Sequence, residues 1–170
     1  MAGVKPIPQG MHTVTPNLVL RDCAKAIDFY KKALGAQEVS RMTAPDGKSI
    51  WHAELRIGDS VVFLQDEMPG MSRPPPTTAE PSPVTLWLYV QDADRAYKQA
   101  VDAGAKSLME PADMFWGDRC GGVADPFGYT WSFATHKKDM TVDEMKRAGE
   151  EFARQMQQRQ GQGGAQPGQR

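Results

Sequence analysis

Residues 14–35 read VTPNLVLRDCAKAIDFYKKALG and decide the fold of this chain. Residues 14–20 alternate as a half-buried strand does. Apolar residues then recur at the three- and four-residue spacing of a helix. Asp22 is of a type that caps helix N-termini, and Gly35 is of a type that ends helices. The stretch therefore predicts a strand that leads directly into a capped helix.

Three more strands are expected after this helix. Residues 38–42, 50–57 and 61–65 have strand-like composition and are separated by short turns. Asp46-Gly47 lies in the first turn, and an Asp-Gly pair between alternating runs is a strong hairpin signal. The first half of the chain therefore predicts the order β-α-β-β-β.

The second half repeats this order. A strand is expected at 84–90 and a helix at 96–103, followed by weaker strands near 106–109 and 121–124 and a strand at 129–134. Asp92 lies 70 positions after Asp22, and Gly104 lies 69 positions after Gly35. This nearly constant offset favours an internal duplication, although two unrelated β-α units would also share such cap residues by chance.

Composition divides the chain into six segments. They are an irregular N-terminus at 1–11, a first module at 12–67, a Pro-rich linker at 68–83, a second module at 84–136, a C-terminal helix within 137–156 and a tail at 157–170. The Pro-Pro-Pro run of the linker favours an extended backbone without ladder hydrogen bonds. The last helix is expected to begin at Thr141, which forms a capping-box pattern with Glu144. The Gln- and Gly-rich tail is expected to be disordered.

Charge and cysteine content exclude several classes of protein. The 170 residues include 20 Lys or Arg and 21 Asp or Glu, so no basic excess attracts nucleic acid or an anionic membrane. No apolar run approaches the ~18 residues of a membrane span, and the N-terminus has no secretory pattern. Cys23 and Cys120 lie far apart, outside any metal-binding spacing. We expect a cytoplasmic protein with reduced thiols and with neither nucleic-acid nor membrane partners.

Several segments together resemble a known superfamily. They are RDCAKAIDFYKKALGA at 21–36, HAELRIGDSVVFLQDE at 52–67, GDRCGGVADPFGYTWSFATH at 117–136 and DMTVDEM at 139–145. The tandem units resemble the glyoxalase/bleomycin-resistance/extradiol-dioxygenase (vicinal oxygen chelate) superfamily, and most of all its PhnB-like branch. The resemblance implies an α+β fold of tandem βαβββ modules, whose curved mixed sheets form a concave cleft for a small ligand. It also implies a homodimer, and it leaves open whether the cleft forms within one chain or across two.

Catalytic members of this superfamily hold a metal ion at four strand positions. The resemblance places these positions at Thr15, Phe63, Thr85 and Ser132. A divalent ion requires imidazole, thiolate or carboxylate donors, whereas these residues offer three neutral hydroxyls and a phenyl ring. We therefore expect no metal and no other cofactor. Glyoxalase I-type isomerisation and extradiol ring cleavage are disfavoured, since both depend on that metal.

Strand alternation separates two faces of the expected sheets. The helix-facing set is apolar: Leu18, Leu20, Val62, Leu64, Leu86, Leu88, Val90, Trp131 and Phe133. The ligand-binding candidates on the cleft-facing side combine aromatic rings with neutral polar groups: Thr15, Asn17, Phe63, Gln65, Thr85, Trp87, Tyr89 and Ser132. Such a wall suits a planar small molecule. Alternatively, its aromatic residues fill a collapsed interior or a subunit interface.

Three ionisable residues share one face of the strand at 50–57. They are His52, Glu54 and Arg56. As candidate catalytic residues, His52 and Glu54 would form an acid/base pair, and Arg56 would bind an anionic ligand group. Alternatively, all three form a solvated strand face, and we favour this interpretation for Arg56.

Two adjacent aromatic residues, Phe115 and Trp116, precede a glycine in an expected loop. We interpret them as a ligand-binding lid, with a hydrophobic plug between the modules as the alternative. Asp118 and Arg119 are interpreted as a local ion pair, and His136 as a solvated strand end. The turn at 125–128 is expected to set the register of the last strand.

Three functions remain open. The leading hypothesis is a metal-independent binding protein that sequesters an aromatic or antibiotic-like ligand, as bleomycin-resistance relatives do. The second is a glyoxalase-like lyase or isomerase that uses His52 and Glu54, or a metalloenzyme whose non-standard site includes them. In the third, the helix that begins at Thr141 mediates protein assembly and the cleft is filled.

Overall fold

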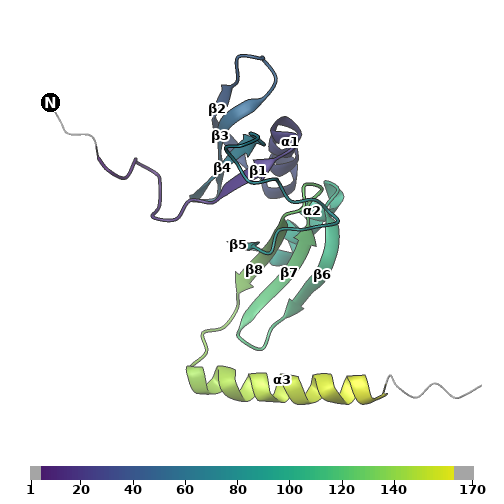
Figure 1. Ribbon diagram of the computed structural model, residues 1–170. Helices are drawn as coiled ribbons and strands as arrows, with labels where there is room; N and C mark the ends of the chain where they lie inside the picture. The colour runs from purple at the N-terminus through teal and green to yellow at the C-terminus, as the bar shows by residue number, and fades with distance from the viewer. Residues whose placement is uncertain (1–4, 163–170) are drawn as a thin grey trace, which may run out of the picture.

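The computed structural model describes the backbone of residues 5–162 and the side chains as far as residue 158. The first module contains β1 (Asn17–Leu20), α1 (Cys23–Leu34), β2 (Gln37–Thr43), β3 (Ile50–Ile57) and β4 (Ser60–Asp66). The second contains β5 (Thr85–Tyr89), α2 (Ala93–Asp102), β6 (Lys106–Asp113), β7 (Asp118–Ala124) and β8 (Thr130–His136). A last helix, α3 (Val142–Gln162), follows at one end of the molecule (Figure 1). None of the described helices is long and apolar enough to cross a membrane.

Each module forms one four-stranded mixed sheet. The strand orders are β1-β4-β3-β2 and β5-β8-β7-β6, so the two sheets have the same topology. In each sheet the first and last strands of the module pair in parallel, and the other pairs are antiparallel. This arrangement confirms the predicted α+β fold of tandem βαβββ modules with a C-terminal helix.

The helix ends follow the capping pattern of the sequence. The Asp22 side chain accepts a hydrogen bond from Lys25 N at 3.0 Å, and Gly35 ends α1 with a φ of 65°. Asp92 caps α2 in the same way. The Thr141–Glu144 capping box is confirmed, because Thr141 Oγ1 accepts from Glu144 N and the Glu144 carboxylate accepts from Thr141 N.

Some element ends differ from the predicted ones. β6 extends to Asp113 instead of ending near residue 109, and it includes Pro111. Proline is tolerated there because β6 is an edge strand and its pairing with β7 is irregular between Met109 and Ala112. The C-terminal helix continues past residue 156 to Gln162, since Gln and Arg are good helix formers. Residues 163–170 of the expected tail lie outside the described part of the chain.

The helix-facing side chains of both sheets form the core. Leu18, Leu20 and Leu64 are buried under α1, and Trp131 and Phe133 are buried in the second module. The remaining members of the predicted helix-facing set are buried or pack against this core as partly buried side chains. The prediction from strand alternation is therefore confirmed.

The two modules meet through their helices and through one buried carboxylate. Helices α1 and α2 contact each other where the modules meet (Figure 1). Asp125, which is 2% exposed, accepts hydrogen bonds from Tyr30 Oη at 2.8 Å and Trp131 Nε1 at 2.9 Å. It also accepts from the backbone of Phe127 and Tyr129. The turn that was expected only to set strand register therefore also joins the modules.

Each sheet has one face that its helix covers and one face that its helix does not cover. Each helix covers the core face of its own sheet, and the two helices contact each other. We call the opposite face of each sheet, which its own helix does not cover, the open face.

Candidate functional site

The open face of the first sheet collects six of the predicted site residues: Asn17, His52, Glu54, Arg56, Phe63 and Gln65. In the strand register Asn17 lies beside Phe63, and Phe63 lies beside Glu54. Asn17 Nδ2 donates to Gln65 Oε1 at 3.1 Å. The ring of His52 meets that of Phe63 edge to face, with centroids 4.8 Å apart. This face is thus a polar and aromatic surface around Phe63.

His52 and Glu54, the residues of the predicted acid/base pair, lie close together on β3. His52 Nε2 lies 3.5 Å from Glu54 Oε1, at the outer limit of a hydrogen bond. Arg56 donates to the neutral amide oxygen Oε1 of Gln37 on β2 at 3.3 Å. Thr15 lies before β1, where its hydroxyl donates to the carbonyl oxygen of His12 at 3.4 Å.

The open face of the second sheet carries the other strand candidates. Thr85, Trp87 and Tyr89 alternate along β5, and Ser132 lies beside Trp87 on β8. Trp87 is 44% exposed and Tyr89 is 67% exposed, and their ring centroids are 6.4 Å apart. Two large aromatic side chains are therefore exposed next to a hydroxyl group.

A buried carboxylate below these rings was not predicted. Asp118 is 4% exposed, and its Oδ2 accepts from Tyr89 Oη at 3.0 Å and from Trp116 Nε1 at 3.1 Å. Its Oδ1 lies 2.8 Å from His136 Nδ1, which must donate because a carboxylate only accepts. Asp118 therefore draws three ring-bearing side chains from three parts of the chain together.

The hydrogen bonds of this cluster change the pKa values of its members. Burial alone would raise the pKa of Asp118, but donors from His136, Tyr89 and Trp116 outweigh it and hold that pKa below its ordinary value. The hydrogen bond to Asp118 raises the pKa of His136, and a second bond to Asp139 acts in the same direction. The hydrogen bond to Asp118 also raises the pKa of Tyr89.

The interpretation of Asp118 and Arg119 as an ion pair is wrong. Arg119 is bound by Asp94 at 2.6 and 2.7 Å and by Asp113 at 3.2 Å. His136 ends β8 with a side chain that is 53% exposed, as expected for a strand end, but its Nδ1 is held by the buried Asp118, which was not expected. The contact between Asp118 and His136 follows from the register of β7 and β8, which places these two residues opposite each other although they lie 18 positions apart in the sequence.

Phe115 and Trp116 belong to the turn between β6 and β7, at the end of the second module that is far from the first (Figure 1). Phe115 packs against Phe152 of α3, with ring centroids 5.5 Å apart. Trp116 instead donates to Asp118. The turn therefore links α3 to the open face of the second sheet.

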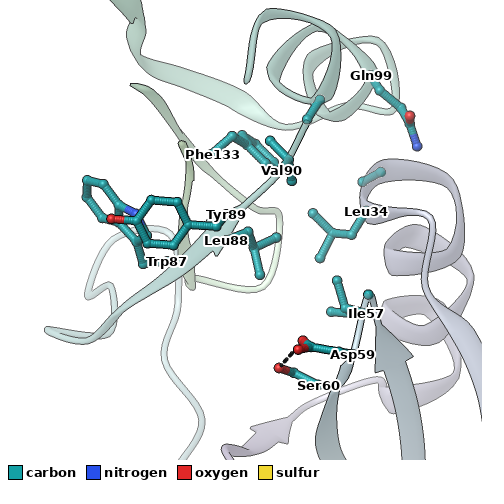
Figure 2. A pocket seen from close by; sticks show the side chains of 13 residues that line it. Leu34, Ile57, Asp59, Ser60, Trp87, Leu88, Tyr89, Val90, Gln99 and Phe133 are labelled. Atoms are coloured by element: carbon teal, nitrogen blue, oxygen red, sulfur yellow. Dashed lines mark hydrogen bonds between the residues drawn. The ribbon is translucent and has the colours of Figure 1, made fainter. Parts of the chain in front are cut away.

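A cavity of about 570 Å³ lies between the modules, and its lining includes Trp87 and Tyr89 of β5. Figure 2 shows Leu34 and Ile57 facing Leu88 and Val90 across it. Trp87 and Tyr89 lie together on the other side of β5. The lining combines apolar side chains of both modules with the polar side chains of Asp59, Ser60 and Gln99.

The residues at the four family metal positions do not fit a metal ion. Phe63 offers no donor atom, and Thr15, Thr85 and Ser132 offer neutral hydroxyls. The nearby His52 and Glu54 supply two donors. Within residues 5–162, no group of three or more His, Cys, Asp or Glu side chains is placed to hold a metal.

Comparison with known proteins covers most of the chain. The family model described as Glyoxalase/Bleomycin resistance protein/Dioxygenase superfamily matches residues 10–133. An uncharacterized protein of Mycobacterium tuberculosis is 44% identical over 138 residues, which cover 79% of this chain and 81% of that protein.

Solved structures share the fold. The X-ray structure of the Arabidopsis thaliana gene product At5g48480 has a TM-score of 0.58 at 32% identity, and the match covers 73% of this chain and 98% of that one. The PhnB protein from Bacillus cereus has a TM-score of 0.55 at 14% identity, with 73% of this chain and 99% of that one covered. At this identity the likeness concerns the fold alone.

Proposed function

The chain belongs to the glyoxalase/bleomycin resistance protein/dioxygenase superfamily, and from this premise we propose that it is a metal-independent binding protein for a small, planar aromatic or antibiotic-like molecule. The proposal is metal-independent because the residues at the four metal positions offer neutral hydroxyls and a phenyl ring, which are poor ligands for a divalent ion. The protein then binds its ligand through ring contacts and neutral hydrogen bonds. It functions in the cytoplasm, in line with its two free, buried thiols at Cys23 and Cys120.

The observation that carries the proposal is the exposed pair of Trp87 and Tyr89. Large aromatic side chains bury much apolar area when they contact a partner, and their faces favour planar molecules. Ser132 and Thr85 lie beside them and supply hydroxyls that orient a ligand. On the first sheet Phe63 has the same kind of surroundings, with the amides of Asn17 and Gln65.

Two copies of the chain complete this site in the proposal. The two modules of one chain contact each other through their helices, on the sides opposite the open faces. A symmetric dimer brings the first-module face of one copy against the second-module face of the other. The cleft is then lined by Phe63 of one chain and by Trp87 and Tyr89 of its partner.

Calorimetric titration with quinoline and with 1,4-naphthoquinone tests the binding function. We expect Trp87→Ala to weaken binding about five- to thirtyfold, the effect of losing ~1–2 kcal/mol of ring contact. Trp51→Ala is the matched control, because Trp51 is 45% exposed but lies in a separate hollow with Met42 and Met71. Equal loss in both variants, or wild-type binding no tighter than that of a generic protein surface, would refute the proposal.

The second candidate is a lyase or isomerase. The observation that favours it is the 3.5 Å approach of His52 Nε2 to Glu54 Oε1 beside the aromatic ring of Phe63. In this function His52 accepts a proton from the substrate, and Glu54 orients the imidazole. His52→Gln retains the size of the side chain but not its basicity. An unchanged turnover in that variant, on any substrate that the protein converts, would eliminate this candidate.

A further inference from the structure

The outward-facing nitrogen of His136, Nε2, is paired with a carboxylate of the same chain, that of Asp139. Asp139 Oδ1 lies 3.0 Å from His136 Nε2, just beyond the end of β8. The side chain of Asp139 is fully exposed, whereas that of His136 is 53% exposed. An exposed ion pair of this kind contributes little to stability, so the Asp139 side chain can leave the imidazole at small cost.

The imidazole itself is held in place from the opposite side. His136 Nδ1 donates to Asp118, whose side chain is 5% exposed and is also bound by Tyr89 and Trp116. This bond fixes the plane of the ring and directs Nε2 outward. The titratable groups around the ring are Asp118, Asp139 and Tyr89, followed along the chain by Lys137 and Lys138. The two carboxylates raise the pKa of His136, which favours the doubly protonated ring with Nε2 as a charged donor.

Aromatic side chains gather at the carboxylate that holds this imidazole. The Tyr89 hydroxyl and Trp116 Nε1 both bind the carboxylate that binds His136, so the three rings converge on one group. Tyr89 continues toward Trp87 along the same face. The charged His136 would bind a carboxylate, and the rings of Tyr89 and Trp87 would contact a planar aromatic ring. Together they suit an aromatic ligand that carries a carboxylate.

We propose that His136 Nε2 binds the carboxylate of a planar aromatic acid whose ring lies against Tyr89, and that Asp139 occupies this position in the absence of ligand. The inference rests on the proposed function, because it extends the second-module part of the same site and names the chemical class of its ligand. Binding exchanges one carboxylate for another on the same N–H group. The side chain of Asp139 returns to solvent.

Calorimetry with 2-naphthoate and its uncharged analogue 2-naphthamide tests the proposal. We expect the acid to bind more tightly than the amide, and His136→Gln to weaken binding of the acid about tenfold or more while leaving the amide unchanged. We expect Asp139→Asn to strengthen binding of the acid about two- to fivefold, because it removes the internal competitor. Asp143→Asn removes the same charge from an exposed position nearby in α3 and is the matched control.

Imidazole NMR signals locate the ligand, since the chain has three histidines. We expect 2-naphthoate to shift the His136 signals at Nε2 and to leave those of His12 unchanged. Equal affinity of acid and amide would overturn the carboxylate site while the proposed function stands. Failure of both probes to bind the wild type would overturn both proposals. Binding that Asp139→Asn leaves unchanged or weakens, or that Asp143→Asn strengthens equally, would also overturn the inference.

Discussion

At the scale of single residues, two buried aspartates organise the second module. Asp118 and Asp125 are the buried charged side chains of the described chain, and each is surrounded by donors. Asp125 binds side chains of both modules, whereas Asp118 binds the rings of the open face. A buried carboxylate with several donors is stable in place, and its removal leaves those donors without partners.

We expect Asp125→Ala to lower the free energy of unfolding by about 3 kcal/mol or more, because buried N–H and O–H groups lose their acceptor. Tyr30→Phe, which removes one of the four hydrogen bonds, is expected to cost about 1 kcal/mol. Urea denaturation followed by tryptophan fluorescence measures both values. An Asp125→Ala variant as stable as Tyr30→Phe would show that this carboxylate does not join the modules.

The pairing of His136 with Asp118 makes stability depend on pH. The pKa of His136 is raised in the folded protein, so the stabilisation is fully present below the unfolded value near 6.5 and is lost as pH rises through the folded value. We expect the wild type to exceed His136→Gln in stability at pH 5.5 and the difference to shrink by pH 9. Denaturation midpoints at several pH values measure it. A difference that does not vary with pH would contradict the raised pKa.

At the scale of elements, the linker and the 125–128 turn hold each other. Ser82 N donates to Gly128 O at 2.8 Å, and the backbone of Thr77 lies where a β-carbon of residue 128 would be placed. Gly128 has a φ of 92°, and an added β-carbon would lie 2.7 Å from Thr77 O. The Pro-rich segment is therefore packed onto the second module at this point.

We expect Gly128→Ala to be clearly more destabilising than Gly35→Ala, by about 2 kcal/mol or more. Gly35 also has a positive φ, of 65°, but nothing lies within 4 Å of an added β-carbon. Gly35→Ala, the control, is therefore expected to lose only the ~1–2 kcal/mol that a residue with a β-carbon costs in the left-handed backbone conformation. Thermal unfolding of both variants measures the difference, and equal losses would show that the linker yields to the added methyl group.

At the scale of the whole molecule, the contact between α1 and α2 joins the two modules on their helix-covered sides. In the proposed dimer, the open faces opposite these helices form a cleft shared between two copies. Helix α3 extends beyond the second module and contacts it at Phe115 (Figure 1). Phe152 and Met156 of this helix are exposed apolar side chains.

Mixing two defective variants tests the shared cleft. We expect Trp87→Ala and Phe63→Ala each to bind quinoline poorly as a pure dimer. After unfolding and refolding together, about a quarter of all clefts should combine two intact faces and recover binding. Calorimetry counts these sites, and sedimentation equilibrium checks the mass of the dimer. No recovery, or a monomeric wild type at micromolar concentration, would contradict a cleft shared between copies.

The sequence by itself determined the parts that depend on local physics. Strand alternation, the caps at Asp22 and Asp92, the glycine stop at Gly35 and the capping box at Thr141 predicted the modules and their core faces, because each depends on near neighbours in the chain. Only the tertiary structure showed which side chains surround Asp118 and Asp125, that Arg119 pairs with Asp94 and Asp113, and that α1 contacts α2. These depend on strand register and helix contact between residues that lie 18 to 95 positions apart, which local periodicity does not specify.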